Sequence, residues 1–254
     1  MKHRLHLTAC AASLFAGLFA GLFAGSAAAR NPTDPPPPVS VSGRVSLVSD
    51  YRYRGLSQTD RRPAVQGRLT AEHVSGVHGS VWASSVRDTV YGADAEIDVS
   101  AGYRRAFGGT SVDAGLLYYI FPGADSSASA YFEPYASLAH TLGPVTATLS
   151  AAYAPKQSAL SIGQGREDNL YLASDLAAGV PGTPLSLSAH LGRSFDASYA
   201  TGGRRYTDWS LGASYTRRGV TFGLDYVDTD TRVVTPRGRN AGGAGVVASV
   251  GLAF

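Results

Sequence analysis

The sequence predicts an all-β protein, a transmembrane antiparallel β-barrel of about twelve strands with both termini in the periplasm. Three observations favour this fold: apolar and polar residues alternate with period two, short and long connections alternate strictly, and the last strand ends on Phe254. A soluble sandwich also alternates, but it has no reason to make every second connection long. The composition agrees, because 16% charged residues is low for a soluble domain, and 30 Gly with 14 Tyr disfavours a helical core.

Twelve segments of the chain carry the alternation. They lie near 41–54, 64–74, 77–87, 93–104, 111–121, 130–142, 145–154, 168–180, 185–195, 205–217, 220–228 and 244–254. Every second join is tight, as at Gly143-Pro144 and Arg218-Gly219, whereas the others are longer and polar, as at 155–167 and 229–243. Short periplasmic turns and long outer loops around an even number of strands are typical of outer-membrane barrels.

Residues 1–29 have the features of a secretory signal peptide, with a basic start and an apolar stretch that ends in Ala27-Ala28-Ala29. Cleavage after Ala29 is expected, and a retained membrane anchor is the alternative, since the stretch is long enough to span a bilayer. Residues 30–40 then form a Pro-rich periplasmic segment, and residues 41–254 form the barrel. Two of the 22 Lys and Arg lie in the leader, so the mature chain is nearly neutral and nucleic-acid binding is not predicted.

Aromatic residues are predicted at two levels of the lipid-facing surface. The outer level holds Tyr51, Tyr53, Tyr118, Tyr153, Trp209 and Tyr226, and the inner level holds Tyr103, Tyr215 and Phe254. Phe254 also ends an alternating strand, which looks like the C-terminal signal that the barrel-assembly machinery reads in outer-membrane proteins. The expected partners are therefore that machinery and the outer-membrane lipids of a Gram-negative bacterium.

The segment Ser49–Thr59, SDYRYRGLSQT, resembles the leading motif of the TorF-family porins of proteobacteria. Further matching segments are 63–67 (PAVQG), 82–84 (WAS), 96–98 (EID), 102–103 (GY), 118–123 (YYIFPG), Glu133 and 228–230 (DTD). The resemblance covers essentially the whole mature chain in order. It implies an outer-membrane barrel that acts as a channel, and it carries over no known substrate or catalytic residue.

The polar face of the predicted strands holds the candidate pore-lining residues. These are Arg44, Asp50, Arg52, Arg54, Arg68, Glu72, Asp94, Glu96, Asp98, Arg104, Asp113 and Glu133. Asp175, Asp208 and Asp225 add to the acidic excess, which favours a water-filled pore for small polar solutes or ions with a weak cation preference. The alternative is a set of Arg–carboxylate pairs that brace and fill the interior, and the sequence leaves both open.

Two groups of these residues stand out by their spacing. Asp50, Arg52 and Arg54 share one face if the first strand is continuous, and they would form a constriction or a loop anchor near the outer mouth, or only support folding. Residues 94–98 form a like-charge ladder of Asp94, Glu96 and Asp98, which needs a cation or an arginine such as Arg44 or Arg68.

Other functions find weaker support in the sequence. The basic outer loops suit lipopolysaccharide phosphates, although solvated loops are the simpler interpretation. A lipid-acting hydrolase needs a serine with a histidine and an acid, and the four histidines after the leader (His73, His78, His140 and His190) accompany no Gly-x-Ser-x-Gly motif. No enzyme, no metal and no cofactor is therefore predicted. A structural or adhesive barrel with an occluded interior remains an alternative, and the sequence does not determine the oligomeric state.

Overall fold

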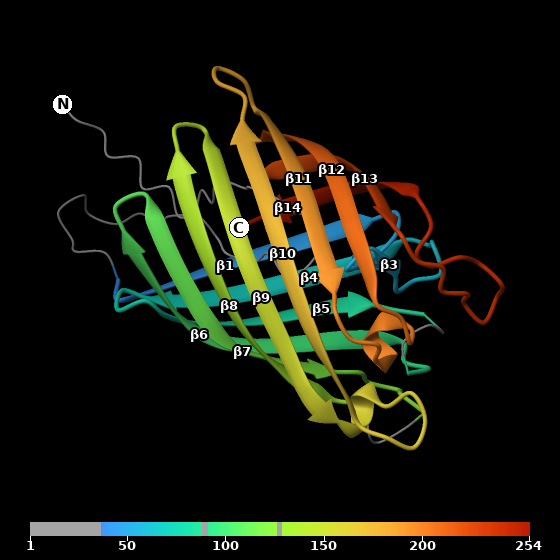
Figure 1. The fold of residues 1–254 in the computed structure, drawn as a ribbon. Helices are drawn as coiled ribbons and strands as arrows, with labels where there is room; N and C mark the ends of the chain where they lie inside the picture. The colour runs from blue at the N-terminus through green and yellow to red at the C-terminus, as the bar shows by residue number, and fades with distance from the viewer. Residues whose placement is uncertain (1–36, 88–90, 126–128) are drawn as a thin grey trace, which may run out of the picture.

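The computed structural model describes residues 37–87, 91–125 and 129–254. In this part of the chain twelve strands close into one antiparallel barrel, in the order β1-β14-β13-β12-β11-β10-β9-β8-β7-β6-β5-β4 (Figure 1). The wall strands are β1 (Val39–Val48), β4 (Ala64–His73), β5 (Val77–Ser85), β6 (Ala95–Phe107), β7 (Thr110–Ile120), β8 (Tyr131–Leu142), β9 (Val145–Gln157), β10 (Glu167–Gly179), β11 (Leu185–Ser194), β12 (Tyr206–Arg217), β13 (Val220–Thr229) and β14 (Gly245–Ala253). The predicted all-β barrel is confirmed.

The outer face of the barrel is apolar and the inner face is polar. In β1, Val45 and Leu47 are each 49% exposed, while their alternating neighbours Arg44 and Ser46 are half-buried. The other wall strands repeat this pattern, with Leu, Val and aromatic side chains outside. A soluble protein has the reverse arrangement, so this barrel is stable only where lipid covers its outer face.

The first predicted strand, 41–54, is wrong at its end, because β1 ends at Val48. The chain then forms a separate hairpin of β2 (Arg52–Tyr53) and β3 (Leu56–Ser57), in which Tyr53 pairs with Leu56. Arg54 and Gly55 form the turn, with φ of 47° and 77°. Positive φ at both central residues is the geometry of a tight hairpin turn. The chain therefore reverses at a position where the sequence predicts a continuous strand.

This reversal corrects two predictions about the residues at 50–54. Asp50, Arg52 and Arg54 do not share the face of one strand, because they lie around a turn. Tyr51 and Tyr53 are only 3% and 5% exposed, so they are buried and do not belong to a lipid-facing girdle. Tyr118, Tyr153 and Tyr226, by contrast, are exposed on the outer face as expected.

The predicted position of Asp94, on the inner face of a strand, is also wrong. Strand β6 begins at Ala95, which is paired with Ser85, and Asp94 lies before it as an exposed residue. Tyr91 and Gly92 both have positive φ, so the chain is still turning here. The predicted ladder therefore reduces to Glu96 and Asp98, which face inward and are 3% and 2% exposed.

Pro134 lies inside β8 without breaking the wall. It pairs with Leu116 of β7, and the ladder to β9 begins only at the next residue, Tyr135. Before Tyr135, the side chain of Gln157 takes the place of the backbone ladder between β8 and β9. Its Oε1 accepts a hydrogen bond from the Phe132 N–H at 2.9 Å, and its Nε2 donates to the Phe132 carbonyl at 2.9 Å. The proline thus lies where β8 needs no N–H toward β9.

The barrel closes between β1 and β14, the first and last wall strands. The Phe254 N–H donates to the Gly43 carbonyl at 2.9 Å, and the Gly43 N–H donates to the Phe254 carbonyl at 2.7 Å. A side chain at Gly43 would overlap the Phe254 ring. Phe254 therefore ends the seam with two backbone hydrogen bonds and covers Gly43 with its ring.

Candidate functional site

The first loop, residues 49–63, folds into the barrel. Tyr53 contacts Tyr119 of β7, with ring centroids 6.0 Å apart, and Arg54 reaches Glu133 of β8 and Asn169 of β10. These partners are inward-facing residues of the wall. The hairpin therefore lies inside the long-loop end of the barrel, and together with the wall around it forms the candidate site.

Asp50 organises the first loop locally. Its Oδ1 accepts hydrogen bonds from Ser57 Oγ at 2.6 Å and from Thr59 Oγ1 at 3.1 Å. Its Oδ2 pairs with the Arg52 guanidinium. One carboxylate thus connects the two arms of the hairpin, which makes the loop a defined structure.

Arg54 joins the hairpin to the wall. Its Nη2 donates to both oxygens of Glu133 at 2.8 Å, and its Nη1 donates to Asn169 Oδ1 at 3.1 Å. The guanidinium also lies over the Tyr171 ring, 4.1 Å from the centroid, and near the Tyr53 ring at 4.8 Å. Arg54 and Glu133 are 2% and 1% exposed, so this is a buried ion pair whose guanidinium lies against two tyrosine rings.

The charge of Arg54 is maintained by its partner. Burial by itself lowers the pKa of Arg54, but the Glu133 carboxylate and the nearby tyrosines raise it well above its usual value. The guanidinium therefore stays charged at neutral pH. The ion pair does not depend on pH through Arg54.

Gly55 lets the turn approach the wall closely. A Cβ at this position would overlap Thr229 Cγ2 and lie 2.8 Å from Asp208 Cβ, and φ is +77°. We expect Gly55→Ala to weaken docking of the hairpin by about 2 kcal/mol, which is about a 30-fold increase in the undocked population. Trypsin cleavage after Arg54, which is buried in the native protein, should accelerate accordingly.

Gly67→Ala is the matched control for this experiment, because no atom lies within 4 Å of a Cβ placed at Gly67. It should leave the rate of cleavage after Arg54 unchanged. Equal rates for Gly55→Ala and the native protein would show that the hairpin does not dock as described.

Two arginines tie the first loop to the last loop, residues 230–244. Arg52 Nη1 donates to the carbonyls of Ala241 at 2.8 Å and Gly243 at 3.1 Å. Arg61 donates to the carbonyls of Asn240 at 3.0 Å and Gly243 at 2.7 Å. The two loops therefore form one hydrogen-bonded unit at the mouth of the barrel.

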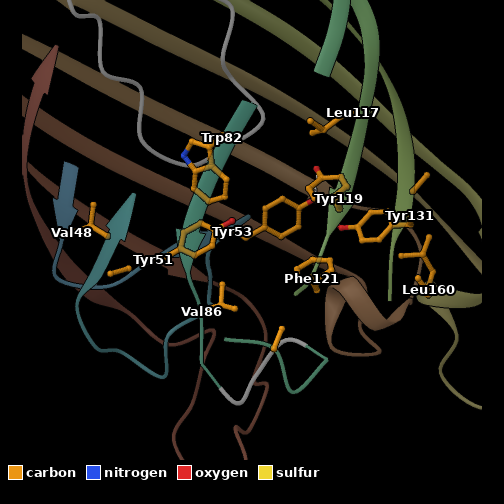
Figure 2. Close-up of a cluster of buried hydrophobic side chains, with 14 of the residues drawn as sticks. Val48, Tyr51, Tyr53, Trp82, Val86, Leu117, Tyr119, Phe121, Tyr131 and Leu160 are labelled. Carbon is orange, nitrogen blue, oxygen red and sulfur yellow. Dashed lines mark hydrogen bonds between the residues drawn. The ribbon is translucent and has the colours of Figure 1, made fainter. Parts of the chain in front are cut away.

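A continuous run of aromatic rings leads from the loops into the barrel. Tyr199 stacks on Tyr91 with centroids 4.3 Å apart, and Tyr91 packs on Phe121 at 4.8 Å. Phe121 and Tyr131 are 6.4 Å apart, and Tyr131 stacks on Tyr119 at 4.4 Å. Figure 2 shows Tyr53, Tyr119, Tyr131 and Phe121 grouped together, with Tyr53 coming from the loop and Tyr119 from the wall.

A charge network braces the wall at the short-turn end. Arg104 donates to Glu72 of β4 and to Asp113 of β7, both at 2.8 Å. His78 Nε2 lies 3.2 Å from the same Asp113. Here the arginine–carboxylate bracing that the sequence suggested as an alternative does occur.

A second network surrounds His190 of β11. Its Nδ1 lies 2.7 Å from Asp175 Oδ1, and its Nε2 lies 3.0 Å from Asp208 Oδ1. Tyr171 donates to Asp208 at 3.1 Å, so the same ring that covers Arg54 also belongs to this cluster. His78 thus pairs with one carboxylate, and His190 pairs with two carboxylates and a tyrosine. Within the described part of the chain, none of these partners is a serine.

The structure brings most of the predicted residues to the interior. Those on inward-facing wall positions are Arg44, Arg68, Glu72, Glu96, Asp98, Arg104, Asp113 and Glu133. Asp50, Arg52 and Arg54 reach the interior on the first loop. Asp94 is exposed and lies ahead of β6, so it does not line the interior. The prediction missed Asn169, Tyr119 and Tyr171, although strand alternation places all three on the inner face and could have identified them.

Among the described residues, no group of three or more His, Cys, Asp or Glu side chains is arranged to hold a metal ion. No helix in the same part of the chain is long and apolar enough to span a bilayer.

A closed barrel of twelve antiparallel strands, apolar outside and charged inside, has the architecture of a transmembrane β-barrel. Residues 32–254 match the model of the Gcw_chp family, described as bacterial proteins of unknown function, and the chain belongs to that family. No curated protein matches the sequence. The resemblance to TorF-family porins is not tested by these matches and stays a prediction.

Solved outer-membrane channels share the fold. The NanC porin is 14% identical over 85% of this chain and 99% of its own, with a TM-score of 0.57. The KdgM porin is 10% identical over 84% of this chain and 97% of its own, with a TM-score of 0.53. The COG4313 outer membrane channel from Pseudomonas putida F1 is 11% identical over 89% and 99%, with a TM-score of 0.52. At these identities the similarity concerns the fold.

Proposed function

We propose that this protein is an outer-membrane channel for the passive diffusion of small polar solutes or ions, with a preference for cations. The observation that carries the proposal is the acidic excess on the inner face of a closed barrel. The inward-facing basic residues of the wall are Arg44, Arg68 and Arg104, and the acidic ones are Glu72, Glu96, Asp98, Asp113, Glu133, Asp175, Asp208 and Asp225. Carboxylates that line a hydrated lumen attract cations and repel anions.

Asp98 supports this interpretation. It is 2% exposed, and neither of its carboxylate oxygens has a hydrogen-bond partner among the described residues. A buried carboxylate without a partner is costly in a dry interior. Water and mobile cations in a lumen would lower that cost.

The acidic interior also separates this channel from one neighbour of the same fold. A KdgM porin has been solved in complex with disordered oligogalacturonate. The excess of carboxylates on the present wall disfavours a polyanion of that kind. The proposed solutes are therefore cations and neutral polar molecules.

The proposal includes a location and an orientation. Residues 1–29 are removed during export, residues 30–40 lie in the periplasm with both termini, and the long loops face outward. Phe254 is read by the barrel-assembly machinery, and the basic outer loops contact lipopolysaccharide. No catalytic step is needed, and the carboxylate and tyrosine partners of His78 and His190 give no support to a serine hydrolase.

The ion pair between Arg54 and Glu133 favours a second candidate, a structural or adhesive barrel whose lumen is occluded by the first loop. Both candidates predict the same fold, so only transport separates them. We expect the purified, heat-modifiable protein to give reproducible conductance steps in a planar bilayer, with a cation-biased reversal potential in a salt gradient. A correctly folded barrel that stays silent would exclude the channel and support the second candidate.

The cation preference should depend on the inner carboxylates. In the double variant Glu96→Gln and Asp98→Asn, we expect the reversal potential to move toward the non-selective value, because two inward charges are lost. Asp94→Asn is the matched control, since it removes one nearby charge from an exposed position. An unchanged reversal potential in the double variant would reject these residues as selectivity determinants.

A further inference from the structure

A cavity of about 100 Å³ lies at the mouth of the barrel, between the first loop, the last loop and the ends of the wall strands. Six of its lining residues carry its chemistry: Tyr53, Tyr91, Glu96, Phe121, Tyr131 and Tyr199. Five of these side chains are aromatic rings, and the sixth is a carboxylate. Val233, Val234 and Pro236 of the last loop contribute apolar surface, so the cavity is mainly apolar with one charged group.

The rings are held in position before any ligand binds. The Tyr91 hydroxyl donates to the Ala159 carbonyl at 2.6 Å, and the Tyr91 N–H donates to the Tyr199 hydroxyl at 3.1 Å. Burial and the neighbouring Tyr199, Tyr53 and Glu96 raise the pKa of Tyr91 above its usual value, so its phenol stays neutral. A preformed set of aromatic faces binds with little loss of conformational entropy.

The charge of the cavity is unbalanced. Glu96 is the one acidic residue among the described residues that line it, and these residues include no Lys, Arg or His. Aromatic faces carry negative potential, so they add to the field of the carboxylate. An anion is disfavoured by both features, and a cation with an apolar surface satisfies both.

The barrel already surrounds one positively charged side chain, that of Arg54, with the same combination of groups. Deeper in the interior, the Arg54 guanidinium lies against the rings of Tyr53 and Tyr171 and pairs with the Glu133 carboxylate. The mouth cavity repeats this arrangement of tyrosine faces and one buried carboxylate. Here, however, no side chain of the described residues supplies the cation.

We propose that the mouth cavity is a binding site for a small organic cation of the alkylammonium class, with the aromatic rings around its alkyl groups and Glu96 opposite its charge. The apolar lining favours an alkylated ammonium over a bare metal ion, which keeps its hydration shell. If the bound cation is also the solute that the barrel transports, the proposal rests on the proposed channel function. Binding itself is measurable without conduction.

The test compares two probes of equal shape on the full-length mature barrel in detergent. Choline carries a quaternary ammonium, and 3,3-dimethylbutan-1-ol is its uncharged isostere. Isothermal titration calorimetry should show choline binding, with the neutral isostere weaker by about tenfold or more, because it lacks the attraction to Glu96 and to the ring faces. Equal affinities for the two probes, or tighter binding of glucose than of choline, would overturn the proposal.

Variants assign the binding to this cavity. Glu96→Gln should weaken choline binding about tenfold, and Tyr199→Leu should weaken it about threefold through the loss of one ring. Asp94→Asn is the control, because it removes a charge from the same mouth without lining the cavity. If Asp94→Asn and Glu96→Gln weaken binding equally, choline senses only the general acidic field and the site is rejected. The probe pair on the native protein decides the question even if a variant fails to fold.

Conductance separates this proposal from the channel function. If the barrel binds choline but gives no current, the binding site is supported and the channel function is rejected. If the barrel conducts but does not distinguish choline from its isostere in calorimetry, the channel function is supported and the binding site is rejected. If both proposals hold, choline at the loop side should reduce the potassium current, and Glu96→Gln should relieve that block.

Discussion

Arg54→Met is expected to release the first loop from the barrel wall. The substitution removes two hydrogen bonds to Glu133, one to Asn169 and the contact with the Tyr171 ring. It also leaves Glu133 as a buried carboxylate without its partner, which typically costs about 3–5 kcal/mol. Chymotrypsin should then cleave after Tyr53, which is 5% exposed in the native protein, and the single-channel conductance should increase severalfold as the loop leaves the lumen.

A second substitution tests the reason for this effect. In the double variant Arg54→Met and Glu133→Leu, the unpaired charge is gone, so we expect the loop to dock more firmly than in Arg54→Met alone. Arg61→Met is the matched control, since Arg61 belongs to the same loop and its guanidinium donates to backbone carbonyls of the last loop. If Arg54→Met leaves both cleavage and conductance at native levels, the ion pair does not hold the loop.

These results also decide between the two candidate functions. A native barrel that conducts, and conducts more after Arg54→Met, has the first loop as a constriction. A native barrel that is silent and conducts only after the substitution is occluded by that loop. In both cases Arg54 and Glu133 control access to the lumen.

Removal of Phe254 is expected to weaken the seam of the barrel. The two backbone hydrogen bonds between Phe254 and Gly43 are lost, and the Gly43 surface beneath the ring is uncovered. At about 1 kcal/mol for each hydrogen bond, the barrel should lose about 2 kcal/mol before any effect of the ring is counted. The urea midpoint of the heat-modifiable form, measured in detergent by gel mobility, should fall.

Phe254→Leu separates the ring from the backbone. This variant keeps both hydrogen bonds to Gly43, so most of the stability in detergent should return. If the barrel-assembly machinery reads the aromatic ring, Phe254→Leu should still reduce the amount of protein in the outer membrane of cells. Native stability after complete removal of Phe254 would contradict the description of the seam.

The hairpin shows where prediction from the sequence fails. Alternation continues smoothly from Val41 to Arg54, so it predicts a first strand that is six residues too long and places Tyr51 and Tyr53 on the lipid side. The Arg54-Gly55 pair was the available signal for a turn, because glycine accepts positive φ readily. The side chains that hold the hairpin in place, Glu133 and Asn169, are distant in the sequence, and local pattern does not predict such contacts.

Alternation and connection lengths predict the barrel, its twelve strands and its polar interior without any knowledge of tertiary contacts. The physical reason is that lipid outside and water inside demand period-two alternation, and short turns with long loops set the order of the strands. The folded chain adds three features that no local pattern contains: the first loop enters the lumen, Arg54 pairs with Glu133, and five rings and Glu96 meet at one cavity. These contacts join residues from different strands and loops, and their energies depend on burial and distance, which are properties of the folded chain.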